Sequence, residues 1–313
     1  MEVDPVAGGN VPTLDGAAIL GRTGDLDEIA EVVAIDRGLT PASHLTFTDL
    51  FDIGATLDRL SDDTAVDGIV VVQGTDTIEE TALFWDLLHA GPKPIVVTGA
   101  MRSASEAGYD GPDNLRDAVR TAIHPGLADQ GVVVVLAHQI HPADDVTKTH
   151  ASALTTFQSL NDGPLGVVHE GVVRLERRRA GRRFVSTRRA AERIGLVIAG
   201  VAMDGSPIDA LVAAGLDGLV VAATGAGNTS PGLLDAAIRA MSLGVPVVLS
   251  TRTPAGRAGT GYAFPGGGAT WERAGALRAG SLTAPKARIA LALGLGAGLD
   301  REALATLLSD PLP

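Results

Sequence analysis

Two residues that could do chemistry follow an apolar strand. Thr75 and Asp76 come after Gly74, at the end of the β-branched run 68–73. A buried strand of a parallel sheet brings the next side chains to the carboxyl edge of the sheet, where open α/β proteins bind their ligands. We therefore expect Thr75 and Asp76 to lie at a functional site. The alternative is a helix cap, because Asp76 and Thr77 each precede a glutamate by three positions, which is the spacing of a capping box.

Lys148 is the second candidate for chemistry. It stands in the run 144–157 among threonines and serines, and no acidic residue is closer to it in the sequence than Asp145. A lysine beside hydroxyl groups could lower the pKa of one of them or orient it within a proton relay. The alternative is an ordinary exposed lysine. The position is notable because lysine occurs only three times, the other two being Lys93 and Lys286.

Two further loops carry polar residues before a helix. The run 96–114 reads as a strand end, a polar loop and a helix start marked by Asp110 and Pro112, so a second loop at the same sheet edge is expected. The run 41–46 precedes another helix and could be a plain serine or threonine cap.

A glycine-rich turn lies in the second half of the chain. The run 224–234 contains a Gly-x-Gly-x-x-Ser pattern, with Ser230 placed as a helix cap and Pro231 in the first helical turn. The pattern superficially resembles a dinucleotide fingerprint, but its third glycine is displaced and no acidic residue ends the next strand. A phosphate site with Arg252 as partner remains the alternative.

The elements that must position these residues alternate along the chain. Strands are predicted over 68–73, 94–98, 131–136, 195–201, 218–223 and 245–250, and helices over 77–89, 112–123, 231–243 and 284–293. Continuous apolar strands between amphipathic helices are typical of parallel sheets with both faces covered. The predicted fold class is α/β, with a larger mixed or parallel N-terminal sheet between helices and a smaller, flavodoxin-like parallel sheet after it.

The predicted boundary between two domains lies in the run 166–193. A small hairpin turned by Glu170 and Gly171 is followed by seven arginines between 177 and 189. In an acidic protein we interpret this run as a solvated linker or a subunit-docking surface, and we assign it no catalytic role. The predicted domains are 1–187 and 188–313.

Composition limits the classes of partner. The chain has 313 residues, 45% of them apolar and only 3% aromatic, with a net charge of −12. Such a charge repels nucleic acid and anionic membranes. Cysteine is absent, which excludes disulfides, thiolate metal sites and cysteine nucleophiles. Neither a signal peptide nor a segment long enough to cross a bilayer is recognisable, so we expect a cytoplasmic protein.

The motifs together resemble the bacterial-type L-asparaginase family, also named the asparaginase–glutaminase family. The resemblance covers essentially the whole chain, and its most specific segments are 73–81, 97–102, 110–115 and 145–149. It implies hydrolysis of L-asparagine to L-aspartate and ammonia, with L-glutamine as a second substrate to test. It implies no metal or other cofactor, and it implies a homodimer or homotetramer.

The resemblance also implies a role for each site residue. Thr75 would be one of two catalytic threonines, Asp76 would bind the α-amino group of the substrate, and Lys148 would complete a Thr-Lys-Asp relay. Ser43 would bind the α-carboxylate, Ala100 would lend a backbone group, and Asn228 would reach the site of a neighbouring subunit. The implied substrate-binding positions are Ser43, Gly74, Thr75, Asp76, Ala100 and Asn228.

One departure from the family concerns the other threonine. Family members begin with an apolar strand that runs into Gly-Gly-Thr, whose threonine is usually taken as the nucleophile, and the printed sequence has no such segment. Thr13 lacks the preceding strand, so the role is not transferred to it. We expect a longer natural product, and little hydrolysis from the printed residues alone. The alternatives are a catalytically impaired relative that binds an amino acid and a nucleotide-binding α/β protein.

Overall fold

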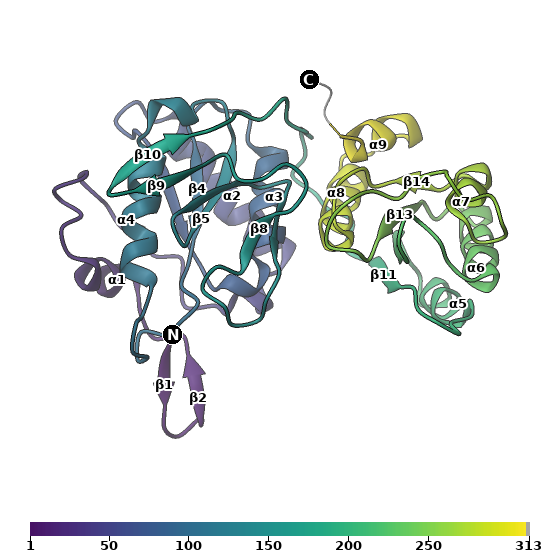
Figure 1. Cartoon of the computed structure of the whole chain (residues 1–313), viewed down its shortest axis with the longest axis horizontal. Helices are drawn as coiled ribbons and strands as arrows, with labels where there is room; N and C mark the ends of the chain where they lie inside the picture. Colours follow the sequence, from purple (N-terminus) through teal and green to yellow (C-terminus); the bar gives the residue numbers. More distant parts are fainter. Residues whose placement is uncertain (311–313) are drawn as a thin grey trace. The chain divides into compact units, whose positions relative to one another are not determined.

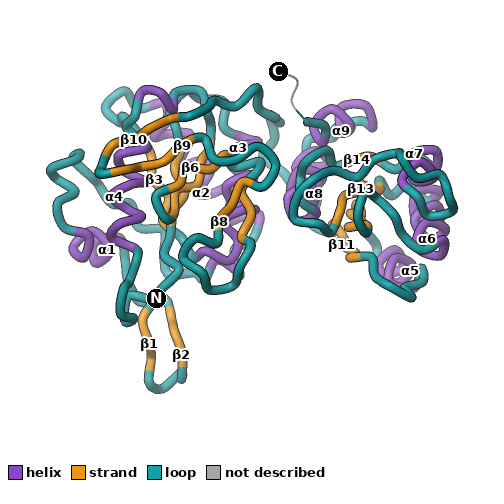
Figure 2. Tube along the Cα trace, in the orientation of Figure 1, coloured by secondary structure: helices purple, strands orange, loops and turns teal. Residues whose placement is uncertain are grey.

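The computed structural model describes residues 1–310, and it divides into two compact units, Met1–Arg182 and Arg183–Pro313. Figures 1 and 2 show that each unit is a sheet flanked by helices. The predicted α/β fold class is confirmed for both. The predicted boundary after residue 187 remains a prediction, and each unit is described by itself below.

A six-stranded mixed sheet forms the centre of the first unit. Its order is β10-β9-β6-β5-β4-β3, with β3, β4 and β5 parallel and the other neighbours antiparallel. The strands are β3 (Ile69–Val72), β4 (Ile95–Thr98), β5 (Val132–Leu136), β6 (Gln139–Pro142), β9 (Gly166–His169) and β10 (Val172–Leu175). The parallel strands are runs of valine and isoleucine, which suits strands covered on both faces.

Helices cover both faces of this sheet (Figure 1). Ala118 and Ala122 of α4 (Gly111–Ala122) pack on one face with Val96, Val133 and Val135. Helix α3 (Ile78–Leu88) packs against β4 and β5, and α2 (Phe47–Asp62) packs against α3. The first helix is α1 (Gly16–Thr23), which contacts α4.

The first unit also contains short elements outside the six-stranded sheet and the four helices. Two of them are hairpins, formed by β1 (Glu2–Asp4) with β2 (Gly9–Val11) and by β7 (Val146–Lys148) with β8 (Phe157–Ser159). The 3₁₀ turns are η1 (Ala42–His44), η2 (Thr75–Thr77) and η3 (Pro125–Leu127). The predicted hairpin over β9 and β10 is confirmed, and its turn residues Glu170 and Gly171 both have positive φ.

The second unit holds a parallel sheet of order β11-β12-β13-β14. Its elements are β11 (Ile194–Ile198), α5 (Ser206–Ala213), β12 (Gly218–Ala223), α6 (Pro231–Ser242), β13 (Val247–Thr251), α7 (Gly268–Ala274), β14 (Leu277–Arg278), α8 (Ala284–Gly296) and α9 (Arg301–Leu308). Helices α5, α6 and α7 contribute to a core on one face, and α8 contacts the first three strands. Apart from short differences at their ends, the predicted strands and helices of both units are confirmed.

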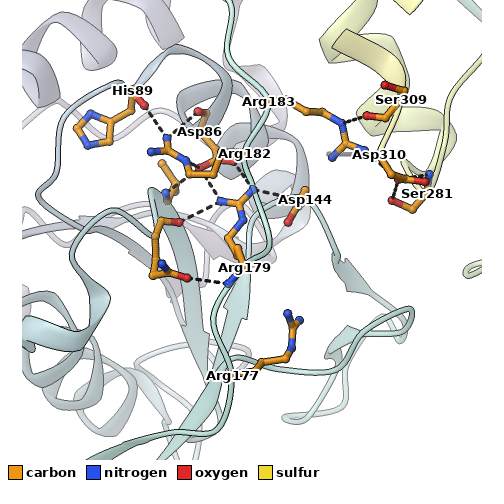
Figure 3. Close-up of polar contacts among 12 residues, drawn as sticks. Asp86, His89, Asp144, Arg177, Arg179, Arg182, Arg183, Ser281, Ser309 and Asp310 are labelled. Carbon is orange, nitrogen blue, oxygen red and sulfur yellow. Dashed lines mark hydrogen bonds and ion pairs between the residues drawn. The ribbon is translucent and has the colours of Figure 1, made fainter. Parts of the chain in front are cut away.

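The interpretation of the arginine run as a solvated linker is wrong for its central members. Figure 3 shows the Arg179 guanidinium facing the carboxylates of Asp86 and Asp144. The Arg179 side chain is only 4% exposed, and its Nη2 lies 2.8 Å from Asp86 Oδ2 and 3.0 Å from Asp144 Oδ2. Arg182 lies 3.3 Å from Asp86, and in the second unit Arg183 lies 3.0 Å from Asp310. These side chains pair with carboxylates of their own unit, of which Asp86 is buried and Asp144 and Asp310 are partly exposed.

Among residues 1–310, no helix has both the length and the apolar character needed to cross a membrane.

Candidate active site

Three predicted residues meet at the carboxyl edge of the first sheet. The strand β3 ends at Val72, and the turn η2 then presents Thr75 and Asp76. The Lys148 Nζ donates to Thr75 Oγ1 at 2.9 Å and to Asp76 Oδ1 at 2.8 Å. Thr75 is buried, whereas 76% of the Asp76 side chain is exposed and open to a ligand. A hydroxyl, an ammonium and a carboxylate thus form one chain of hydrogen bonds.

The capping alternative for this turn is wrong. Neither Asp76 nor Thr77 makes a side-chain capping bond to α3. The Asp76 carboxylate instead pairs with Lys148, and the Thr77 hydroxyl donates to Ala42 O at 3.2 Å. The surface-lysine alternative is also wrong, because the Lys148 side chain is only 13% exposed.

The β7–β8 hairpin delivers Lys148. This lysine is the last residue of β7, paired across the hairpin with buried Phe157, and Thr149 N donates to Thr156 O at 2.8 Å to close the loop beyond it. A cavity of about 310 Å³ opens here, lined by Asp76, Lys148, Thr149, His150 and Ala151. Because the lysine leaves a regular strand, its ammonium has a defined direction toward Thr75.

The loop that contains Ala100 borders the same turn. It follows β4, and Gly99 lies so close to Thr75 that an added Cβ would be 3.2 Å from Thr75 Cγ2 and 2.4 Å from Gln73 O. Ala100 follows directly and is half-buried. The predicted second loop is therefore adjacent to the Thr75 side chain, on the side of its methyl group.

Ser43 and Gly74 lie on neighbouring turns. The turn η1, which holds Ser43, packs beside η2, and an added Cβ at Gly74 would be 3.3 Å from Ala42 Cβ. Ser43 is exposed, and the cap of α2 is Thr46, which forms a capping box with Asp49. The Ser43 hydroxyl is therefore not used as the helix cap.

Asn228 belongs to the second unit. It closes a tight turn after β12, where its backbone pairs with Thr224 in both directions at 2.9 Å. In the same turn Ser230 caps α6 by accepting from Leu233 N at 3.3 Å, as predicted. Arg252, the alternative phosphate partner, donates to Ala199 O at 2.9 Å.

Sequence reasoning missed two residues that the structure places at or near the site. His150 lines the cavity, and its Nδ1 accepts from Ser152 N and Ala153 N at 3.0 and 3.1 Å. Asn114 is buried and donates to Gly99 O at 3.0 Å. The signal for His150 was its place two residues after Lys148, and the signal for Asn114 was its spacing of four from Asp110.

Within residues 1–310, no group of three or more histidine, aspartate or glutamate side chains has the arrangement to hold a metal ion.

Comparisons with known proteins agree over both units. A family model described as asparaginase, N-terminal, matches residues 1–181, and one described as glutaminase/asparaginase C-terminal domain matches residues 193–308. The L-asparaginase of Bacillus licheniformis is 33% identical over 81% of this chain and 79% of its own length.

Two other relatives show the range of the similarity. A probable periplasmic L-asparaginase of Haemophilus influenzae is 36% identical over 79% of this chain and 71% of its own length. A glutaminase-asparaginase of Pseudomonas fluorescens is 30% identical over 74% of this chain and 66% of its own length. The two family models together span most of the chain, and the expected resemblance is confirmed: the chain belongs to the asparaginase–glutaminase family of amidohydrolases.

Proposed function

We propose that this protein hydrolyses the side-chain amide of L-asparagine to L-aspartate and ammonia at the Thr75–Lys148–Asp76 site. The observation that carries the proposal is the pair of hydrogen bonds from Lys148 Nζ to Thr75 and Asp76, at 2.9 and 2.8 Å. The named activities of the relatives support the amide substrate. L-Glutamine remains a second substrate to test.

The geometry supports a proton relay. The nucleophile would be the threonine of the Gly-Gly-Thr segment that the family resemblance implies. Its hydroxyl attacks the amide carbon as its proton passes to the relay formed by Thr75 and Lys148. The lysine then returns a proton to the departing nitrogen, so that ammonia leaves and an acyl ester remains for water to hydrolyse. Asp76, 2.8 Å from the lysine nitrogen, stabilises the ammonium form while it carries the proton.

Substrate orientation is the second part of the proposal. The exposed Asp76 carboxylate would accept the α-ammonium group of the substrate, and the Ser43 hydroxyl would donate to the α-carboxylate. When Asp76 and Ser43 hold the two charged ends of the substrate, their distances from Thr75 decide whether the side-chain amide of asparagine or of glutamine reaches the relay. The extra carbon of glutamine would displace its amide carbonyl from that position.

An assay of ammonia release from L-asparagine tests the activity. We expect little release from the printed residues alone. In a chain extended by an upstream strand that ends in Gly-Gly-Thr, release should be restored, abolished again by Thr75→Ala, and retained by Thr13→Ala, whose hydroxyl donates to Glu2 at 2.8 Å in a different segment. Calorimetry with L-aspartate is run in parallel. Binding of L-aspartate by the extended chain without ammonia release from L-asparagine would instead support an amino-acid-binding relative, and tight binding of a dinucleotide would support the nucleotide alternative.

We also propose that the protein forms a homo-oligomer, at least a dimer, in which Asn228 reaches the site of a neighbouring subunit. The second unit exposes Ile198, Val201, Tyr262 and Phe264, which are apolar side chains suited to a contact between copies. Light scattering at micromolar concentration should give a molar mass of at least twice that of one chain, and a mass of one chain alone would contradict the proposal. A cytoplasmic location remains a prediction, since one relative is described as periplasmic.

A further inference from the structure

The loop after β4 lies directly on the catalytic turn, and glycine is required at their contact. An added Cβ at Gly99 would be 2.4 Å from Gln73 O, a distance that no real Cβ adopts. The loop cannot move toward Thr75, and any movement away would open a gap beside the Thr75 methyl group. The residues that fix this loop therefore influence the site directly.

Asp110 holds the far end of the loop. Its Oδ2 accepts from Met101 N at 3.0 Å and its Oδ1 accepts from Arg102 N at 2.9 Å. The residue stands where the sequence predicts a helix start, but its side chain makes no capping bond to α4. Both carboxylate oxygens are instead directed at the backbone of the loop. Such charge-assisted bonds are stronger than neutral ones.

Asn114 holds the near end. Its side chain, in a residue only 3% exposed, donates from Nδ2 to Gly99 O at 3.0 Å and to Asp110 Oδ2 at 2.9 Å. Its Oδ1 accepts from Ala137 N at 3.0 Å, in the turn between β5 and β6. One buried amide thus joins the loop, the Asp110 carboxylate and the turn after β5.

Ala100 lies between the two anchored ends. In the part of the chain that the structure describes, no hydrogen bond joins its N–H or C=O to another residue. Most backbone groups of folded proteins are paired, so an unpaired peptide next to Gly99, which lies against the Thr75 side chain, is suited to receive a ligand.

We propose that Asp110 and Asn114 are positioning residues that hold the Ala100 peptide groups against the scissile amide of the substrate. The inference rests on the proposed function and extends it to two residues that do not touch the substrate. A peptide group fixed in advance needs no reorganisation during the reaction, and a displacement of about 1 Å can cost about a hundredfold in rate.

Two measurements test this proposal on the full chain. Asp110→Ala and Asn114→Ala are compared with Asp113→Ala, a control in the same helical turn whose side chain is 65% exposed and pairs with Arg116 outside the loop. Hydrogen–deuterium exchange at Met101 and Arg102 should be faster in the two test variants than in the control. For L-asparagine, kcat should fall about tenfold to a hundredfold while KM changes little, because the groups proposed to bind the charged ends are untouched.

A conservative variant separates positioning from simple loss of folding. Asp110→Asn keeps one acceptor oxygen, so its kcat and its amide exchange should lie between those of Asp110→Ala and the parent chain. Unchanged exchange at Met101 and Arg102, or a change confined to KM, would overturn the proposal. Amide exchange is measured on the printed chain, and kcat is measured on the same chain extended by a strand that ends in Gly-Gly-Thr. An extended parent chain without ammonia release would refute the proposed function instead, and amide exchange would still decide whether these residues hold the loop.

Discussion

The three lysines of this chain differ in their surroundings, and two of them, Lys148 and Lys286, are largely or fully enclosed. Lys148 serves Thr75 and Asp76, Lys93 donates to the carbonyls of Leu60 and Asp63, and Lys286 is fully buried on α8. A lysine ammonium is compact and can give up a proton, whereas a guanidinium is planar and remains protonated. At the site this difference concerns the reaction itself.

Lys148→Arg is therefore expected to keep the positive charge and lose the relay. Ammonia release from L-asparagine should fall by roughly 10²- to 10⁴-fold, the range that general acid–base groups contribute, because an arginine cannot accept the Thr75 proton. Lys93→Arg is the matched control and should keep the parent rate. Equal rates for Lys148→Arg and the parent would show that Lys148 supplies only charge.

At the scale of the element, an ion cluster connects the two segments that carry the site. Asp86 lies on α3, which follows the Thr75 turn, and Asp144 lies just before β7, which ends in Lys148. Arg179 joins both carboxylates, and Asp86 also accepts from Val132 N at 2.9 Å. Burial alone would lower the pKa of Arg179, but the two carboxylates outweigh it and keep the guanidinium charged.

Breaking this cluster should destabilise the first unit. Arg179→Met removes the buried cation that pairs with Asp86 and Asp144 and leaves Arg182 beside Asp86. The loss should exceed about 1 kcal/mol and reach at most about 3–5 kcal/mol, the cost of a broken buried pair, whereas Arg239→Met breaks an exposed pair worth at most about 1 kcal/mol. The two tryptophans, Trp85 and Trp271, lie in different units. Denaturant unfolding in Trp271→Phe and Trp85→Phe backgrounds would report each unit separately. A loss below about 1 kcal/mol for Arg179→Met would contradict this account.

Elements were easier to predict from sequence than the partners of their polar residues. The strands β3, β4 and β5 are continuous apolar runs, and a buried strand needs little else to be recognised. Arg179, in contrast, pairs with Asp86 across 93 residues, so no local pattern distinguishes it from a solvated cation. Asp110 has the local signature of a helix cap, yet the loop before it supplies better donors. Thr75 and Lys148 could be paired only through the family resemblance, because 73 residues separate them.

At the scale of the whole molecule, each of the two units has a cluster of ion pairs near its C-terminal end. In the first unit the cluster centres on Arg179, and in the second it centres on Asp310. Asp310 accepts from Ser281 N at 2.9 Å and lies 3.0 Å from both Arg183 and Arg257. Burial alone would raise the pKa of Asp310, but the Ser281 hydrogen bonds and the two arginines outweigh it and hold the pKa below its ordinary value of 3.8.

This carboxylate predicts a pH dependence for the second unit. A depressed pKa in the folded state gives stability that is present above 3.8 and is lost as pH falls through the lower folded value. Asp310→Asn should therefore be less stable than the parent at about pH 6, and the difference should shrink below pH 3.8. Urea unfolding followed by the fluorescence of Trp271 measures the difference in free energy of unfolding between Asp310→Asn and the parent. A difference that does not change with pH would exclude this linkage.

The anchored arginines have a consequence for protease digestion. Trypsin must draw an arginine side chain into its specificity pocket before it can cut, and the side chains of Arg179 and Arg183 are only 4% and 3% exposed. The segment 177–189 contains seven arginines, each a potential trypsin cleavage site. We nevertheless expect brief digestion to leave the bonds after Arg179 and Arg183 uncut. Arg188 and Arg189 are exposed in an irregular segment, and the first cut in this region should fall there.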